Sequence, residues 1–343
     1  MKSTGRRCWS LTSVLTFVVG TFFMLSYHVH LHKDAPRQRN QRTDNMLNPP
    51  ATHRLTSLAD DYHQLINLTD FTFQILANCS QDEDPLVVVV HSAPTYTKYR
   101  NAIRATWGSS PFKVVFMLGA VTNETLQRRL EDEGRRHGDL VQGSFNDSYR
   151  NLTYKHVMAL KWLHYHCQGY KYALKTDDDV FVKLDSIVTL INNGTFPESN
   201  HIVCDVIKRA EVKRSWRSKW RVSPREFHES SYPTYCPGWI VLYSQDVIGR
   251  LYTLAQKESY FWVDDVHITG ILAQRAQVNH KSIKPWRMPS KMVSKVLKKG
   301  HCPWTLCREF AFGSYELEPD EIKLLWTVLS NSKNGSVIQV DTN

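Results

Sequence analysis

The chain has 343 residues, of which 42% are hydrophobic and 22% charged. This ordinary globular composition excludes a wholly disordered, collagen-like or low-complexity protein. The formal net charge is +10, but residues 1–54 hold eight basic residues against two acids, Asp34 and Asp44, and so contribute +6 of it. The rest of the chain is only slightly basic, so the net charge does not by itself indicate nucleic-acid binding.

The N-terminal segment predicts a membrane anchor. Residues 8–31 contain no Asp, Glu, Lys or Arg, and Leu, Val, Phe and Met are frequent in residues 9–27. About 20 residues at 1.5 Å each can span the hydrocarbon core of a bilayer. Three basic residues precede the run, which favours a cytoplasmic tail at 1–7 and a transmembrane signal anchor at 8–28. A cleaved signal peptide is the alternative, but the run is long and no small-x-small cleavage site follows it.

Sequons and cysteines agree with a secretory destination. Excluding Cys8, six cysteines would lie in the lumen, where disulfides are stable, and Cys302 and Cys307 are close enough to pair locally. Seven asparagines are candidate N-glycosylation sites, each followed by x-Ser/Thr. They are Asn67, Asn78, Asn123, Asn146, Asn151, Asn193 and Asn334.

Polar, basic and proline-containing sequence follows the anchor, so we expect a luminal stem over residues 29–84. A catalytic domain is expected over 85–343, because strand and helix patterns alternate from there. Strands are predicted at 86–90, 113–119 and 170–175, and helices at 100–107, 123–137 and 152–167. This alternation indicates an α/β fold with a largely parallel central sheet.

The third strand runs directly into Asp177, Asp178 and Asp179. Active sites in α/β sheets lie beyond the carboxyl ends of the strands. Adjacent carboxylates repel one another unless a cation is present, and oxygen ligands favour Mg²⁺ or Mn²⁺. A solvated acidic turn is the alternative, but the apolar residues on both sides place the three acids inside a packed segment.

A second acidic site, Asp264 and Asp265, opens a predicted helix beside Phe261 and Trp262. Acids at a helix N-terminus can cap the helix and interact favourably with its dipole. A carboxylate beside aromatic rings can equally act as a general base near a sugar. The spacing alone leaves both interpretations open.

Five ordered motifs resemble the beta-1,3-galactosyltransferase/beta-1,3-N-acetylglucosaminyltransferase family of inverting glycosyltransferases (glycosyltransferase family 31). The similarity covers about residues 86–330 and is therefore specific. The motifs are 100–108 (RNAIRATWG), 145–155 (FNDSYRNLTYK), 174–182 (LKTDDDVFV), 232–238 (YPTYCPG) and 264–266 (DDV).

The resemblance implies a GT-A-type nucleotide-sugar fold, a UDP-sugar donor and Mn²⁺ (or Mg²⁺). It implies that Asp265 is the catalytic base, that Asp177, Asp178 and Asp179 hold the metal, and that Asp179 is the most direct ligand. Donor-binding residues are expected at Arg100, Arg104, Trp107 and Lys175. Acceptor-side residues are expected at Tyr235, Gly238, Trp262 and Asp264.

The expected reaction is transfer of a sugar, galactose by first choice, in a beta-1,3 linkage. The acceptor would be a glycan on a glycoprotein, glycolipid or proteoglycan. Transfer of N-acetylglucosamine or N-acetylgalactosamine is the alternative, as is an inactive family member that acts as a partner protein. The anchor and stem resemble a single-pass type II protein of the Golgi membrane with a luminal catalytic domain. Nucleic acid is not an expected partner.

Two features remain open at this stage. Many relatives carry a His near the C-terminal helix start where this chain has Tyr315, which leaves the metal-ligand set open, with His280 and His301 as available substitutes. Basic runs at 208–225 and 281–299 are compatible with solvated surfaces. The resemblance places the first run near the acceptor side, and the second could border the diphosphate or face an anionic glycan.

Overall fold

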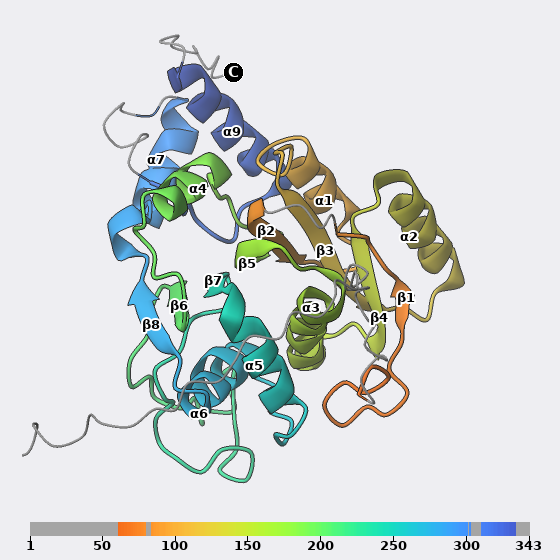
Figure 1. The fold of residues 1–343 in the computed structure, drawn as a ribbon. Coiled ribbons are helices and arrows are strands. Elements are labelled where there is room, and N and C mark those ends of the chain that lie inside the picture. The colour runs from red at the N-terminus through yellow and green to blue at the C-terminus, as the bar shows by residue number, and fades with distance from the viewer. Residues whose placement is uncertain (1–60, 80–83, 301, 303–309, 334–343) are drawn as a thin grey trace, which may run out of the picture. The chain divides into compact units, whose positions relative to one another are not determined.

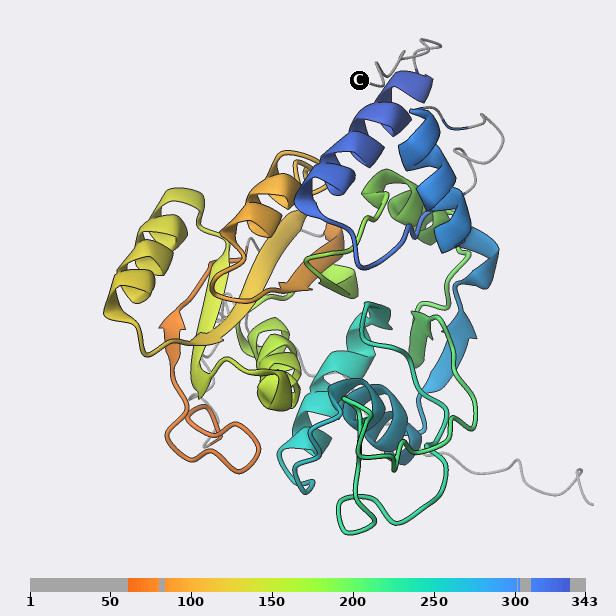
Figure 2. The same ribbon diagram turned by 180° about the vertical axis from the view of Figure 1, so that it is seen from behind.

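The computed structural model describes residues 61–79, 84–300, 302 and 310–333. Among these residues are eight strands and eight α-helices, shown in Figures 1 and 2. The strands are β1 (Phe73–Ile75), β2 (Asp84–His91), β3 (Lys113–Ala120), β4 (Leu140–Asn146), β5 (Tyr170–Asp177), β6 (His201–Cys204), β7 (Ile240–Ser244) and β8 (Asn279–Ser282). The helices are α1 (Thr97–Arg104), α2 (Glu124–His137), α3 (Leu152–His166), α4 (Leu184–Asn192), α5 (Gln245–Ala255), α6 (Ala273–Arg275), α7 (Ser290–Lys299) and α9 (Pro319–Lys333). A π-helix spans Val266–Leu272.

All eight strands form one mixed sheet in the order β1-β4-β3-β2-β5-β7-β6-β8. The central strands β4, β3, β2 and β5 are parallel, whereas β1 and β7 pair antiparallel with their neighbours β4 and β5. The predicted α/β class is confirmed, and the parallel part is limited to the centre and to the β6–β8 pair.

Helices bury both faces of the sheet, which explains the continuous apolar run of β2. Leu86, Val88 and Val90 belong to one core, which also contains residues of α1, α4, α7 and α9. Val87 and Val89 belong to a second core with α3, α5 and the π-helix. Successive strand residues point to opposite faces, so a strand covered on both sides is apolar at successive positions, as β2 is from Leu86 to Val90.

The folded part begins before the predicted domain boundary at residue 85. Leu65, Ile66 and Phe71 are buried, and β1 pairs with β4. A disulfide joins Cys79 to Cys167. The prediction that the stem extends to residue 84 is therefore wrong for 61–79, because this segment carries apolar side chains that only the sheet and α3 can bury.

Among the described residues, no helix has the length and apolar composition needed to cross a bilayer. The predicted tail and anchor at 1–28 lie outside the described residues. Five of the six sequon asparagines in the described ranges are exposed, and Asn151 is half-buried. Asn334 lies outside the described ranges.

Disulfides also join segments that are distant in sequence. Cys204, at the end of β6, bonds Cys236 and closes the long connection between β6 and β7. Cys302 is disulfide-bonded as well. Its expected partner, Cys307, lies outside the described residues.

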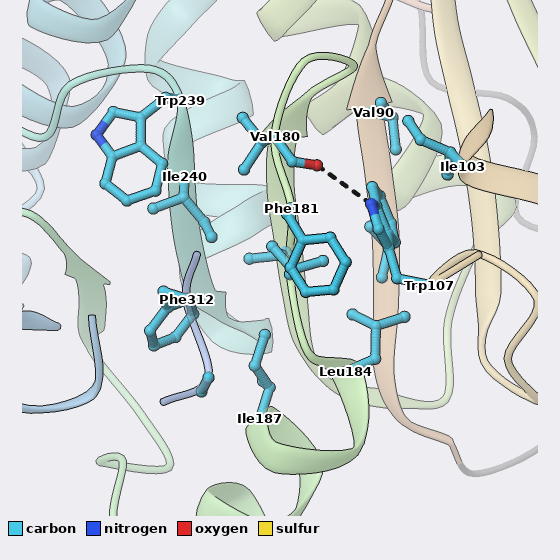
Figure 3. Packing of buried hydrophobic residues seen from close by; sticks show 14 of the residues in the cluster. Val90, Ile103, Trp107, Val180, Phe181, Leu184, Ile187, Trp239, Ile240 and Phe312 are labelled. Carbon is cyan, nitrogen blue, oxygen red and sulfur yellow. Dashed lines mark hydrogen bonds between the residues drawn. The ribbon is translucent and has the colours of Figure 1, made fainter. Parts of the chain in front are cut away.

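The segment after the three acids is fixed by the core beneath it. Val180 and Phe181 are buried against Trp107, whose indole Nε1 donates to the Val180 carbonyl at 3.1 Å (Figure 3). Gly313 lies against Phe181 so closely that an added Cβ would be 2.5 Å from the Phe181 carbonyl oxygen. Trp107 and Gly313 therefore hold the chain in place just beyond the acidic strand end.

Trp107→Ala tests this support. Removing a fully buried tryptophan costs about 3–5 kcal/mol of unfolding free energy. We expect this loss in urea denaturation of the protein. Trp216 is 78% exposed, so Trp216→Ala is the control and should stay within about 0.5 kcal/mol of the unmutated protein. Equal losses for the two variants would contradict the packing described here.

Candidate active site

The carboxyl ends of β2 and β5 meet at one edge of the sheet. His91, the last residue of β2, is in register with Asp177, the last residue of β5. The Asp178 amide then donates to the His91 carbonyl at 3.1 Å, which turns the chain over the sheet edge. The fold thus places the three consecutive acids at the strand ends, where the sequence predicted a site.

The three acids have unequal surroundings. Asp178 is buried, and its Oδ2 has no hydrogen-bond partner among the described residues. Burial and the neighbouring carboxylates raise the pKa of Asp178 to about 7, and that of Asp179 to about 6. The Asp177 side chain is 37% exposed. Each raised pKa shows that a nearby positive charge would stabilise this strand end.

Lys175 joins this strand end to the second acidic site. The pleat of β5 directs Ala173 and Lys175 to the face covered by α3 and the π-helix. The Lys175 ammonium is buried, lies 2.6 Å from the Asp177 carboxylate and donates to the Gly238 carbonyl. Burial disfavours the charge on Lys175, but Asp177, Asp264 and Asp265 outweigh that effect and raise its pKa. One ammonium therefore compensates carboxylates from both sites.

Gly238 allows these groups to approach. A Cβ at this position would lie 3.4 Å from the Lys175 Nζ, 3.8 Å from the Asp265 Cβ and 3.9 Å from an Asp264 carboxylate oxygen. Since the backbone carbonyl of Gly238 also accepts from Lys175, the 232–238 segment lies directly between the two acidic sites.

Asp264 is held by a buried hydrogen-bond chain. Its Oδ2 lies 3.0 Å from Nδ1 of His156 on α3, and His156 Nε2 lies 2.9 Å from the Tyr243 hydroxyl on β7. Burial lowers the pKa of His156, so the ring is neutral, donates from Nδ1 to the carboxylate and accepts from Tyr243. Burial disfavours the Asp264 charge, but His156 and Lys175 outweigh it and keep its pKa below the ordinary value.

Asp265 differs from its neighbour in protonation. Burial, and then the Asp264 charge, raise the pKa of Asp265 to about 7. Its Oδ1 accepts from the Val266 amide at 2.7 Å at the start of the π-helix. Both interpretations of the acid pair are thus compatible with the structure: Asp265 interacts with the helix start, and it has the pKa expected of a base near neutral pH.

A pocket of about 500 Å³ opens in front of this pair. Asp264, Asp265, Tyr235 and Trp262 line it, so the structure brings these predicted residues together, with Gly238 immediately behind them. The π-helix supports one wall: Pro233 Cγ and Tyr235 Cβ would each be 3.2 Å from a Cβ at Gly270. Aromatic walls and a carboxylate floor suit a sugar with a reacting hydroxyl.

Two of the predicted donor-binding residues, Arg100 and Arg104, form ion pairs within the fold. Arg100 is completely buried and forms a bidentate ion pair with Glu133 on α2, at 2.7 and 2.8 Å. Arg104 pairs with Glu133 and Asp139 near the amino-terminal ends of the strands, on the opposite edge of the sheet. These pairs tie α1 to α2 and β4. The donor-binding prediction is wrong for both arginines because their charged groups bind Glu133 and Asp139.

The other two donor-binding predictions also need revision. Trp107 is 1% exposed and is a core residue beneath the acidic segment. Lys175 does lie at the centre of the site, but its buried ammonium is bound to Asp177 and Gly238. We therefore assign both residues to positioning the acids.

The loop that carries Tyr315 packs beside the metal candidates. The Leu317 amide donates to the Asp179 carbonyl at 3.0 Å, and the Tyr315 ring lies 5.2 Å from the Trp239 ring. The loop that carries Tyr315 therefore borders the acidic strand end. His280, one possible substitute for the family His, is engaged at 2.6 Å with the Thr269 carbonyl, and His301 lies outside the described residues.

The acidic strand end fits a divalent ion that the donor helps to bind. Within the described ranges, no three His, Cys, Asp or Glu side chains are arranged to hold a metal by themselves. Magnesium-type ions, however, bind proteins through one or two carboxylates and complete their shell with substrate phosphates. The unpartnered oxygen of Asp178 and the raised pKa of Asp179 agree with such a site.

Sequence reasoning missed His156 and Tyr243. Both lie in apolar stretches, where a single polar side chain carries no recognisable pattern. The motif at 145–155 ends one residue before His156, so its only signal was a histidine on the buried face of α3. Tyr149 and Trp220, which also line the pocket, come from segments remote from Asp265 in sequence.

Comparison with known proteins identifies similar sequences. The Galactosyltransferase family model matches residues 98–284. Beta-1,3-galactosyltransferase 5 of Gorilla gorilla gorilla is 31% identical over 208 residues, which cover 59% of this chain and 69% of the relative. Beta-1,3-galactosyltransferase 1 of Homo sapiens is 27% identical over 278 residues, covering 77% and 80%. The WbbM bifunctional glycosyltransferase structure matches 75% of this chain and 53% of its own, with 11% identity and a TM-score of 0.39, too low to assign a fold.

The hydrogen-bond chain behind Asp264 predicts a graded loss of stability. His156→Phe leaves a buried carboxylate without its donor and should cost about 2–3 kcal/mol at pH 7. Tyr243→Phe removes only the outer bond and should cost about 1 kcal/mol. The folded-state pKa of Asp264 is depressed, so the His156→Phe deficit should shrink as the pH falls below about 4. Urea unfolding at pH 7 and pH 3.5 measures both effects. A larger loss of unfolding free energy for Tyr243→Phe than for His156→Phe would contradict the order of the hydrogen bonds described here.

Proposed function

This chain belongs to the galactosyltransferase family of glycosyltransferases, and we propose that it transfers a sugar with inversion from a UDP-sugar to a glycan hydroxyl in a beta-1,3 linkage. Galactose is the first choice of sugar. The observation that carries the proposal is the buried Lys175 ammonium, which pairs with Asp177 at 2.6 Å and whose pKa is raised by the charges of Asp264 and Asp265 as well. A displacement needs these two kinds of site side by side: one for the leaving diphosphate and one for the attacking hydroxyl.

Asp265 is the proposed base. It lies in the pocket, and its pKa of about 7 lets it be deprotonated and still accept a proton near neutral pH. Asp264 is kept ionised by His156 and Lys175, and so keeps the Asp265 pKa high. Two carboxylates whose surroundings push their pKa values apart take different roles.

The reaction is a single displacement. The acceptor oxygen forms a bond to the anomeric carbon as its proton passes to Asp265. The bond from that carbon to the diphosphate oxygen breaks on the opposite face, and UDP leaves with the electron pair. An α-linked donor thus gives a β-linked product, and no covalent enzyme intermediate is formed.

Asp179, with Asp177, would hold a Mn²⁺ or Mg²⁺ ion at the diphosphate. Such an ion neutralises the charge that develops on the leaving group. Asp178 is buried, and its unpartnered Oδ2 is the third carboxylate oxygen that we propose for this ion. A GT-A-type arrangement, with the donor above the carboxyl ends of the parallel strands, follows from this assignment.

The proposed setting is the Golgi lumen. Support comes from the charge pattern around residues 8–28, the seven sequons and the disulfides between segments far apart in sequence. In this setting the chain is a single-pass type II membrane glycoprotein. Glycosidase treatment and protection of a C-terminal tag from added protease would test the orientation.

Two other functions stay in view. Transfer of N-acetylglucosamine or N-acetylgalactosamine uses the same acids, and a screen for UDP release over a panel of UDP-sugars separates these donors. A role as an inactive partner protein is favoured by one observation, Tyr315 in place of the family His beside Asp179. The absence of UDP release from every donor, with UDP still bound, would favour that role.

The base assignment predicts opposite behaviour of two neighbouring variants. Asp265→Asn should reduce transfer at least about a hundredfold. It should keep near-normal melting and UDP binding, because Asn retains the size of Asp and most of its capping ability. Asp264→Asn should lose less activity, since Asp265 keeps the proton-accepting position. If Asp265→Asn stayed within tenfold and Asp264→Asn abolished transfer, the base would be Asp264.

The same assignment fixes the pH profile. Transfer should fall as the pH drops through about 7, because Asp265 becomes protonated. In Asp264→Asn a negative neighbour is removed, so the pKa of Asp265 falls and the acid limb of the profile moves to lower pH. The pH dependence of kcat/KM for both proteins measures this shift. A shift to higher pH would contradict the proposed coupling.

The donor assignment predicts metal-dependent binding. Asp179→Ala should lose UDP-sugar binding together with turnover, and EDTA should do the same to the unmutated protein. Calorimetric titration with UDP, with and without Mn²⁺, measures the effect. Asp185→Ala, on α4 after the acidic segment, is the matched control and should bind normally. Normal Mn²⁺-dependent binding by Asp179→Ala would remove Asp179 from the donor site.

A further inference from the structure

The connection between β6 and β7, residues 205–239, forms one wall of the proposed acceptor pocket. It lies beside α5 and α6 in both views (Figures 1 and 2). The Cys204–Cys236 disulfide closes its base, and Val212, Val222 and Tyr232 pack against Phe261, Trp262 and Val266. Arg214 has a structural role in this connection, because its guanidinium donates hydrogen bonds to three loop carbonyls, those of Val222, Phe227 and Glu229.

Other cations of this connection face outward. Lys213, Arg217 and Lys219 are exposed, and in the part of the chain that the structure describes none of them forms an ion pair. Glu226 accepts hydrogen bonds from Ser223 and pairs with Arg150. The one acid of the connection that faces the pocket is Glu211.

One of these cations, Lys213, lines the pocket of the proposed base, and Lys219 lies against the ring of Trp220, which also lines it. Lys213 and Trp220 line it together with Asp265. The Lys219 ammonium lies 4.4 Å from the centre of the Trp220 ring, and the Arg150 guanidinium 4.0 Å from that of Trp262. We call the exposed residues Lys213, Arg217 and Lys219 the basic rim. The pocket thus has the carboxylates of Asp264 and Asp265 as its floor, aromatic walls, and an edge that carries Lys213 and Glu211.

Each layer selects a different part of a ligand. The floor repels an anion, so the sugar that offers its hydroxyl to Asp265 must be neutral. Aromatic rings pack against the C–H faces of sugars. The basic rim gains no electrostatic attraction from a neutral glycan. It attracts a glycan that carries a carboxylate or sulfate beyond the floor of the pocket.

We propose that the acceptor is an anionic glycan, with a carboxylate or sulfate on a sugar next to the one that is glycosylated, bound by Lys213 and Lys219 on the basic rim. The proposal rests on the transferase function proposed above and names its acceptor class. Arg217 adds to the local positive field at the edge of the wall.

Three matched trisaccharides test this. Each ends in the same neutral sugar, and the penultimate sugar is neutral, sulfated or a uronate. Calorimetric titration without donor, at 50 and 300 mM NaCl, measures binding to the unmutated luminal protein. Two or three exposed ion pairs should give about a tenfold preference for an anionic ligand at the lower salt concentration. Higher salt should reduce it. The sulfate and uronate arms identify which anion the rim prefers.

Lys213→Ala/Lys219→Ala should abolish the preference and leave binding of the neutral trisaccharide unchanged. Lys291→Ala/Lys295→Ala, on exposed positions of α7 in the other basic run, removes the same charge and should retain the preference. Melting temperatures establish that both double variants are folded. If the rim variant does not fold, the salt dependence of the unmutated protein decides the matter.

The outcomes separate the two proposals. Equal binding of all three trisaccharides would overturn the anionic acceptor, and transfer to the neutral one would still support the transferase. Anionic preference without transfer or UDP release would support the rim and contradict the transferase. Binding of phosphatidylserine vesicles through the rim, with no preference among the trisaccharides, would assign it to a membrane surface and overturn the proposal.

Discussion

A buried ammonium holds this site together. Lys175 lies in the middle of a central strand, where an unpaired charge would be severely destabilising, and the carboxylates of Asp177, Asp264 and Asp265 offset its desolvation. The interaction also explains the close approach at Gly238, since the ammonium needs that carbonyl as an additional acceptor. The two acidic sites therefore share the charge of one ammonium.

The surroundings of Asp264 and Asp265 give these adjacent aspartates different pKa values. His156 and Tyr243 form a hydrogen-bond chain that keeps Asp264 ionised, whereas Asp265 has a like charge beside it and accepts hydrogen bonds from backbone amides, that of Val266 among them. Their pKa values diverge for reasons of position alone. The hydrogen-bond chain from Tyr243 to Asp264 is buried. The basic rim on the β6–β7 connection is exposed to solvent, so a ligand can bind there without changing the hydrogen bonds of the acid pair.

Local patterns predicted much of this fold. The apolar run of β2 and the stripe of α3 gave strands and helices close to their observed bounds, and the strand-end rule located the acids. The motifs identified the family, and the family model agrees. Contacts between residues distant in sequence could not be predicted. No local pattern indicates that Arg100 pairs with Glu133, or that β7 lies antiparallel beside β5. The motif arginines were therefore assigned to the donor, although their charges are used to join helices.

The central claim is that both acidic sites act on one displacement at one carbon. The most direct test is the anomeric configuration of the product. The protein would be incubated with an α-linked UDP-sugar carrying ¹³C at the anomeric carbon, with Mn²⁺ and with an acceptor, and the anomeric coupling of the product would be measured by NMR. A β-linked product is predicted, because the hydroxyl held at Asp265 attacks opposite to the diphosphate. An α-linked product would contradict the account.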